Sequence, residues 1–250
     1  MLWHKAWVET RWRALVGLGV LLCSAGGAVL LYPQLMKLVP NAPPADAGSI
    51  IARQIREAAD LMRDYRGYVF AQWFRQPQLW TIMAAILGTG GLLTQGAALF
   101  TLSMPVSRER LIGVRALVGL VELLALAIIP TLLLPLLSPV VGESYPLGDA
   151  LVHALCMFVA GTVFFSLAFL LSTAFADVWR PLLLTLAAAV ALVSIELLLR
   201  RTGAHGVFGV MSGDSYFRTG RLPWLGLFAS AAASAAMLWL AALSISRRDF

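Results

Sequence analysis

The stretch LIGVRALVGLVELLALAIIPTLLLPLL, residues 111–137, decides the fold class of this chain, because only Arg115 and Glu122 within it are ionisable. A helix crosses the hydrocarbon core of a bilayer with about 20 mostly apolar residues, so this stretch is long enough to span a membrane. Further stretches along the chain share this character. We place six spans at about residues 14–35, 79–101, 111–137, 149–175, 180–200 and 222–245.

The composition of the whole chain excludes a soluble globule. Of its 250 residues, 60% are hydrophobic and only 13% are charged, which is too few to cover a surface that faces water. The segments between the spans are too short for a separate domain. We therefore predict an all-α integral membrane protein with a single transmembrane domain, residues 1–250. Its six-helix transmembrane bundle carries an N-terminal interfacial helix and an amphipathic helix between spans one and two.

The formal net charge of +6 fits a membrane surface. Arg and Lys gather near the ends of the spans, where anionic lipid headgroups attract them, so we expect membrane lipid and no nucleic acid as their partner. The total of Lys and Arg is balanced between the two sides of a six-span topology. Basic clusters at the N-terminus, in residues 101–115 and at the C-terminus favour a cytoplasmic position for both termini.

The first 13 residues combine Trp3, Trp7 and Trp12 with basic side chains. Trp3 and Trp7 share one face of a helix, and Trp is enriched at the interface between membrane and water. We predict that residues 1–13 form a short interfacial helix anchored by these three side chains. The alternative is an ordinary aromatic and basic flank of the first span.

Two polar segments interrupt the spans. Residues 36–78 form an extracytoplasmic loop, in which the spacing of Ile51, Ile55 and Met62 predicts an amphipathic helix over residues 46–66. Residues 201–221 are rich in glycine, and we expect an irregular loop there that returns to the interface around Phe208.

Ionisable residues inside a span are the first functional candidates, because their burial is costly. Glu122 lies about three turns into the third span, where it either makes a buried hydrogen bond between helices or faces a polar cavity. Glu196 ends the fifth span, and Arg200 four residues later favours a pair on the helix surface. Asp149 and His153 have the same spacing, which favours a local pair.

The sequence offers no hydrolytic machinery. It has no HExxH metal motif and no GxxxxGK[ST] phosphate loop, and its three histidines, at positions 4, 153 and 205, are far apart. Ser212-Gly213 lies in a polar loop, and no histidine in the last span could act as its base. We therefore expect no catalytic residue, metal site or cofactor in this chain, and an energy source that is either an ion gradient or a partner.

The most specific segment is the loop between spans two and three, QGAALFTLSMPVSRERLIGVR, residues 95–115. Its Pro105-Val106-Ser107-Arg108 turn, followed by an apolar step into the next span, resembles the corresponding loop of ABC-2 type transporter permeases. The Trp-His-Lys-x-Trp start at residues 3–7, the Arg-Arg-Asp-Phe end at residues 247–250 and the six-span layout are also similar to that family.

This resemblance implies a partner that supplies the energy. In the family the loop forms a coupling helix that docks on a separate ATPase subunit, which holds ATP and Mg²⁺, and the N-terminal segment is an interfacial connecting helix. Residues 101–111 here would form the docking surface, through the side chains Thr101, Ser103, Pro105, Ser107, Arg108, Glu109 and Arg110. Gln95 and Leu99 stand where members often carry acidic residues, so the contacts with the ATPase differ in detail.

The resemblance further implies a transmembrane subunit of an exporter in the bacterial cytoplasmic membrane, paired with a second copy of itself or a homologue. Few intramembrane charges and mostly short loops favour an amphipathic or hydrophobic substrate. Two other classes remain open: a membrane scaffold or regulatory subunit that transports nothing, and a gradient-driven transporter, for which more intramembrane ionisable residues are expected.

Overall fold

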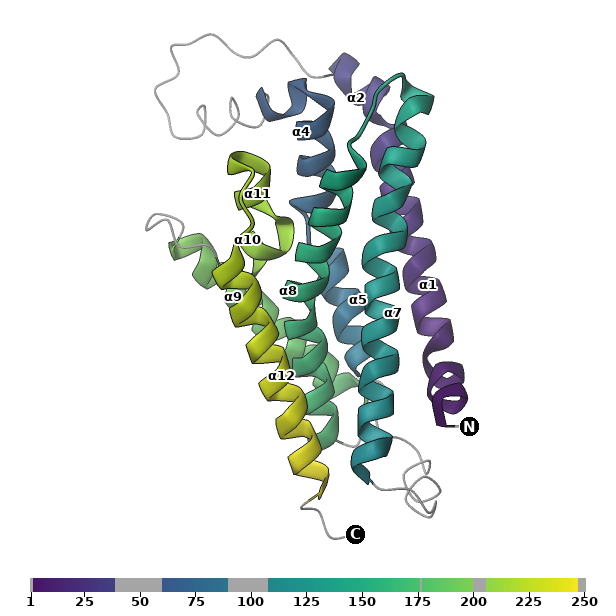
Figure 1. Ribbon diagram of the computed structural model, residues 1–250, viewed down its shortest axis with the longest axis vertical. Coiled ribbons are helices and arrows are strands. Elements are labelled where there is room, and N and C mark those ends of the chain that lie inside the picture. The colour runs from purple at the N-terminus through teal and green to yellow at the C-terminus, as the bar shows by residue number, and fades with distance from the viewer. Residues whose placement is uncertain (1, 39–59, 90–107, 176, 200–205, 247–250) are drawn as a thin grey trace.

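The computed structural model describes residues 2–38, 60–89, 108–175, 177–199 and 206–246, and all regular secondary structure in these ranges is helical. Figure 1 shows a tall bundle in which the first described helix begins and the last one ends at the same end. We call this the terminal end and the opposite one the distal end. The elements are α1 (Leu2–Leu30), α2 (Tyr32–Leu38), α4 (Tyr65–Val69), the π-helical η1 (Phe70–Phe74), α5 (Gln78–Gly88), α7 (Arg108–Leu137), the 3-10 helix η2 (Ser138–Val141), α8 (Leu147–Ala174), α9 (Trp179–Leu199), α10 (Val207–Ser212), α11 (Asp214–Thr219) and α12 (Trp224–Ser246).

Within the described residues, α1, α7, α8, α9 and α12 are long and apolar enough to cross a membrane. The chain is therefore a multi-pass membrane protein by length and composition. The expected second span, residues 79–101, is described only up to Thr89, where α5 supplies its first part. Five spanning helices are thus present, and the sixth stays a prediction.

Helix α8 is the centre of the bundle, and α5, α7, α9, α10 and α12 all pack against it, while α1 lies along α7. Glycines allow the closest approaches. A Cβ on Gly88 of α5 would lie 2.4 Å from the carbonyl oxygen of Phe165 in α8, and one on Gly119 of α7 would lie 2.6 Å from the ring of the same residue. Small residues at such positions let helices pack tightly in lipid.

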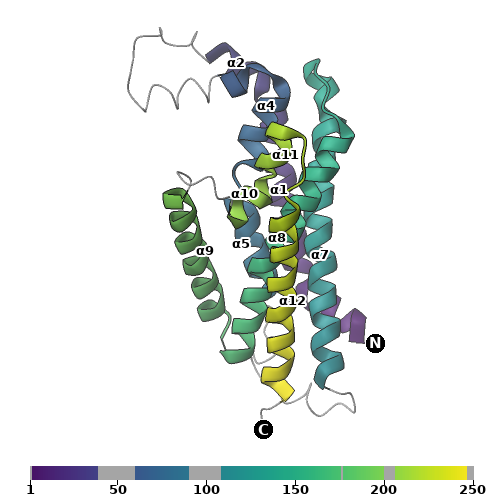
Figure 2. The same cartoon turned by 60° about the vertical axis from the view of Figure 1, so that its left-hand side comes forward.

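Helices α9 and α12 present most of their large apolar side chains outward. Leu198 of α9 and Leu225 of α12 are 76% and 89% exposed, and Figure 2 shows α9 standing apart from the main body of the bundle. Apolar surfaces of this extent are unfavourable in water, whereas the acyl chains of a bilayer solvate them. This exposure agrees with a membrane environment.

The structure changes one predicted boundary. The N-terminal residues do not form a separate helix, since α1 runs without a break from Leu2 to Leu30. Helix α7 is likewise continuous, although it contains Pro130 and Pro135. Neighbouring helices in a membrane protein can satisfy the carbonyl groups that a proline leaves free.

The two polar segments contain buried helices. Of residues 36–78, the range 39–59 lies outside the described part, so the amphipathic helix predicted over 46–66 is seen only where residues 60–63 are helical. Beyond it, α4 and η1 carry a run of side chains with almost no exposure, among them Tyr68, Phe70 and Phe74. The expected irregular loop at 201–221 is wrong for residues 207–219, which form the two short helices α10 and α11.

Candidate functional site

The predicted docking surface lies mostly outside the described residues. Thr101, Ser103, Pro105 and Ser107 are not described, so their role stays a prediction. The side chains of Arg108 and Glu109 are likewise outside the description, although both residues belong to the first turn of α7. Arg110 is exposed at that turn, at the terminal end of the bundle (Figure 1).

The three tryptophans expected as interfacial anchors all lie on the first half of α1. Trp3, Trp7 and Trp12 are 53%, 44% and 67% exposed, and the guanidinium of Arg11 lies 5.8 Å from the ring centre of Trp12. They sit at the terminal end, where a helix that crosses a bilayer reaches the headgroups. Their exposure suits anchoring. They lie on the continuous helix α1, however, and not on the separate interfacial helix that we predicted.

Glu122 makes the inter-helix hydrogen bond that was one of its two expected roles. It is 3% exposed, and Thr10 of α1 donates its hydroxyl proton to the carboxylate. The second carboxylate oxygen is buried without a hydrogen-bond partner in the described part of the chain. About two turns nearer the terminal end, Arg115 pairs with Glu9 at 3.3 Å. These contacts join α7 to α1 close to the predicted docking surface.

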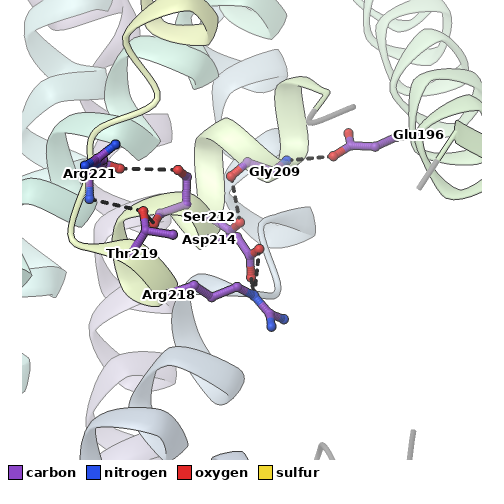
Figure 3. A network of polar contacts seen from close by, with 8 residues as sticks. Glu196, Gly209, Ser212, Asp214, Arg218, Thr219 and Arg221 are labelled. Carbon is purple, nitrogen blue, oxygen red and sulfur yellow. Dashed lines mark hydrogen bonds and ion pairs between the residues drawn. The ribbon is translucent and has the colours of Figure 1, made fainter. Parts of the chain in front are cut away.

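Glu196 binds a helix terminus. Its carboxylate accepts hydrogen bonds from the backbone N–H groups of Phe208, at 3.1 Å, and Gly209, at 2.8 Å. These groups belong to the first turn of α10, and Figure 3 shows the carboxylate reaching that turn from the neighbouring helix α9. The first N–H groups of a helix have no partner inside it and carry a partial positive charge. The expected partner, Arg200, lies outside the described residues.

Helices α10 and α11 form a compact hairpin, which is closed by its own polar contacts. Gly213 joins the two helices with φ of +68°, a left-handed conformation that favours glycine. On α11, Arg218 pairs with Asp214 at 3.0 Å, and Thr219 donates to the carbonyl oxygen of Ser215 at 2.7 Å (Figure 3). These contacts stabilise α11 itself, and Gly213 joins it directly to α10.

The sequence did not reveal the cluster that holds this hairpin to the bundle. We call Arg66, Asp149, His153 and Tyr216 the distal cluster. The Asp149 carboxylate lies 2.6 Å from Nε of Arg66 in α4, and Tyr216 of α11 donates to its other oxygen at 3.0 Å. The Arg66 N–H is not aligned for a hydrogen bond, so this contact is an ion pair.

His153 completes the distal cluster. The spacing of the two residues had suggested a local pair with Asp149, but His153 contacts the Asp149 backbone and not its carboxylate. Its Nδ1 lies 2.7 Å from the backbone oxygen of Asp149. The ring is fully buried between Phe74, at 4.3 Å between ring centres, and Tyr216, at 5.5 Å. Its Nε2 has no hydrogen-bond partner among the described residues. The cluster thus joins three segments that are far apart in the sequence: α4–η1, the start of α8 and the α10–α11 hairpin.

A second set of contacts joins the same distal end to α1 and α7. Tyr65 of α4 and Ser138 of η2 share a hydrogen bond of 2.7 Å, and Tyr68 donates to the carbonyl oxygen of Ala28 at 2.8 Å. Tyr145, in the short link before α8, is 5% exposed and its hydroxyl has no hydrogen-bond partner in the described part. Burial, followed by the charge of Asp149, raises the pKa of Tyr145 above its usual value.

Comparison with known proteins finds no matching family model, no matching curated protein and no matching solved structure. The function must therefore be argued from the residues and their arrangement.

The signals in the sequence that pointed to the distal cluster were Asp149 and His153, four residues apart at the start of the fourth span, and Arg66 at the start of an aromatic segment, RGYVFAQWF, at residues 66–74. The partners Arg66 and Tyr216 could not be assigned to Asp149 from these signals.

Proposed function

We propose that this chain is the transmembrane subunit of an ABC-2 type exporter, driven by ATP hydrolysis in a separate ATPase subunit. The proposal rests on the Pro105-Val106-Ser107-Arg108 turn, which resembles the loop of ABC-2 type permeases that docks on the ATPase. Helix α7 begins at Arg108 at the terminal end of the bundle (Figure 1). A subunit docked on the preceding loop would act directly on the start of that helix.

The described contacts support a path from this loop to the distal end. Helix α7 is continuous from Arg108 to Leu137 and is followed at once by η2. There Ser138 binds Tyr65, the residue before Arg66 of the distal cluster. A packed helix moves as a rigid element, so a displacement at its first turn reaches α4 and the hairpin bound to it. ATP would then bias the bundle between two arrangements.

The alternative with a specific observation behind it is a gradient-driven transporter. The Glu122 carboxylate is buried, and one of its oxygens has no hydrogen-bond partner among the residues that the structure describes. An intramembrane acid of this kind is a candidate proton carrier. The ATP-driven proposal gives Glu122 a structural role, as the partner of Thr10. A transport assay with Glu122→Gln separates the two, because the amide cannot carry a proton but keeps the hydrogen bond.

The direct test is co-purification of the tagged chain with an ATPase from its native membrane, followed by vanadate-sensitive ATP hydrolysis in lipid. We expect a stable complex, and its loss when Arg108 and Arg110 are both replaced by Glu. Arg180→Glu is the matched control, since Arg180 is also exposed and also lies in the first turn of a helix that starts at the terminal end. Recovery of no ATPase, or a complex that survives the double replacement, would overturn the proposal.

A further inference from the structure

The helix that would lead into the second span is broken between η1 and α5. The five residues of η1 are π-helical, the backbone N–H of Arg75 still bonds to the oxygen of Phe70 at 2.9 Å, and α5 then starts after Pro77. Proline cannot donate a backbone hydrogen bond. At membrane depth, a non-helical backbone is tolerated only where it is buried in protein or lines a cavity. Single π-helical turns are also frequent at functional sites.

A cavity of about 220 Å³ lies at this break, between α1, η1, α5 and α8. Its depth follows from the helices around it. Met157, which lines it, comes ten residues after the distal start of α8, or about 15 Å along the axis at about 1.5 Å per residue. The cavity therefore lies beside the membrane-spanning helices α1 and α8.

The lining of the cavity combines uncharged polar side chains with apolar ones, among them Leu21, Leu79 and Met157. Gln72, Gln76, Gln78 and Ser24 supply amide and hydroxyl groups, and the cavity wall also includes Trp73, whose indole N–H is buried without a partner in the described part of the chain. A polar group in hydrocarbon without a hydrogen bond costs several kcal/mol. The unpartnered indole N–H of Trp73, with the amide of Gln72 beside it, therefore favours a hydrogen-bonding occupant.

We propose that this cavity binds the uncharged, hydroxyl- or amide-rich head group of a membrane amphiphile. Amides both donate and accept hydrogen bonds, so they match hydroxyl groups, whereas a charged head group would find no opposite charge among the lining residues. The volume is below the roughly 300–1,000 Å³ of pockets for drug-sized ligands, which suits a head group alone. The acyl chains would stay in the bilayer, reached past Gln76 and Gln78, which are exposed on the side of the bundle.

Binding itself does not depend on the proposed function. If the chain is an exporter subunit, the amphiphile bound here is its cargo, and this second step rests on the proposed function. The cavity lies between the terminal end, where an ATPase would dock, and the distal cluster. Phe74, the last residue of η1, packs against His153 with 4.3 Å between ring centres. An occupant at the break is thus one residue away from the contacts that hold the distal end together.

The test is native mass spectrometry of the purified chain, with monoglucosyl diacylglycerol as probe and phosphatidylglycerol of the same acyl chains as the anionic comparison. We expect the glucosyl lipid to bind at least tenfold more tightly. The double variant Gln72→Leu/Gln76→Leu should abolish this preference. Ser24→Leu, which fills the cavity from α1 without altering a glutamine, should weaken binding of the glucosyl lipid as well. Gln34→Leu is the matched control, because Gln34 is an exposed glutamine of α2 outside the cavity.

Three results would overturn the proposal. Equal or tighter binding of phosphatidylglycerol would show that a charge, such as the exposed Arg75 next to the lining, decides the ligand. Unchanged lipid binding in both cavity variants would remove the site. If the glutamine variant lowered the proportion of dimers in the mass spectra and left the lipid adducts unchanged, the glutamines would contact a second copy of the chain. None of these results depends on an ATPase, so the two proposals fail separately.

Discussion

Replacement of Asp149 by Asn should destabilise the bundle more than replacement of a carboxylate in an exposed ion pair. The carboxylate forms an ion pair with Arg66 and accepts a hydrogen bond from Tyr216, so it joins α4, α8 and α11. Asn keeps an acceptor for the Tyr216 hydroxyl but removes the charge that faces Arg66. A hydrogen bond to a charged group contributes about 1.5–3 kcal/mol. The Arg66 side chain is 40% exposed and can be hydrated again, so we expect a loss of about 1–2 kcal/mol.

Asp149→Ala should cost about 1 kcal/mol more, because the Tyr216 hydroxyl then loses its acceptor as well. For a chain of this size, about 1 kcal/mol corresponds to about 2–4 °C in Tm, so we expect Asn to lower the thermal midpoint by about 2–8 °C. The measurement is thermal unfolding of the detergent-solubilised protein, followed by tryptophan fluorescence.

Asp214→Asn provides the control, since it removes a similar pair, with Arg218, from a more exposed site where the Arg is 60% exposed. A pair of that kind contributes about 0–1 kcal/mol. The double variant Arg66→Gln/Asp149→Asn should lose less than the sum of its single variants. Equal losses for Asp149→Asn and Asp214→Asn, or simple additivity with Arg66→Gln, would refute a stabilising role for the distal cluster.

Three further predictions concern the same end of the molecule. Gly213→Ala should destabilise the protein more than Gly220→Ala. Both glycines have a φ near +70°, which costs a non-glycine residue about 1–2 kcal/mol, but only at Gly213 would the new Cβ lie 3.0 Å from the His153 ring. Thermal unfolding of the two variants measures the difference, and equal losses would contradict the contact. Tyr145→Phe should keep or raise stability at neutral pH, because it removes a buried hydroxyl that has no partner in the described part of the chain. Burial raises the pKa of Tyr145 in the folded state, so the parent protein loses stability as pH rises from about 10, where the unfolded tyrosine ionises, through the higher folded pKa; the Phe variant should lose less stability in alkaline buffer, and identical pH profiles would argue against this. Glu196→Gln should loosen the hairpin by about 0.3–1 kcal/mol, since a neutral amide interacts less with the helix dipole, and hydrogen exchange of residues 207–219 should then be faster than in the parent, with unchanged exchange as the contrary result.

The sequence was sufficient to predict the membrane class and most of the spanning helices, because length and apolar composition determine both. It was insufficient for the segments between them. Residues 65–74 contain Arg66, Gln72 and five aromatic side chains, and such a mixture fails the apolar criterion for a span. The structure shows why it is nevertheless buried: Tyr65, Tyr68 and Arg66 each find a polar partner on another element. Hydropathy measures side chains singly and cannot include these partners.

The same reasoning applies to Glu196. From the sequence, the nearest opposite charge along its own helix was the reasonable partner. The carboxylate instead binds two backbone N–H groups, which are present in any helix start and leave no trace in the residue pattern. Tertiary contacts to backbone groups are therefore the part of the site that a single sequence conceals most completely.

The polar contacts between elements gather at the two ends of the described bundle. Near the terminal end, helices α1 and α7 are joined by Thr10–Glu122 and Glu9–Arg115. At the distal end, Tyr216, Glu196 and ring contacts attach the α10–α11 hairpin to other elements, in addition to the packing of α10 on α8. Each of these polar contacts contributes on the order of 1 kcal/mol, so a few of them can be exchanged at a cost that ATP binding or a bound amphiphile could supply. The proposed exporter would need such contacts, because an element must be held in each state and released between them. The distal cluster, with its charge pair and a His153 nitrogen that has no partner among the described residues, is where we expect that exchange.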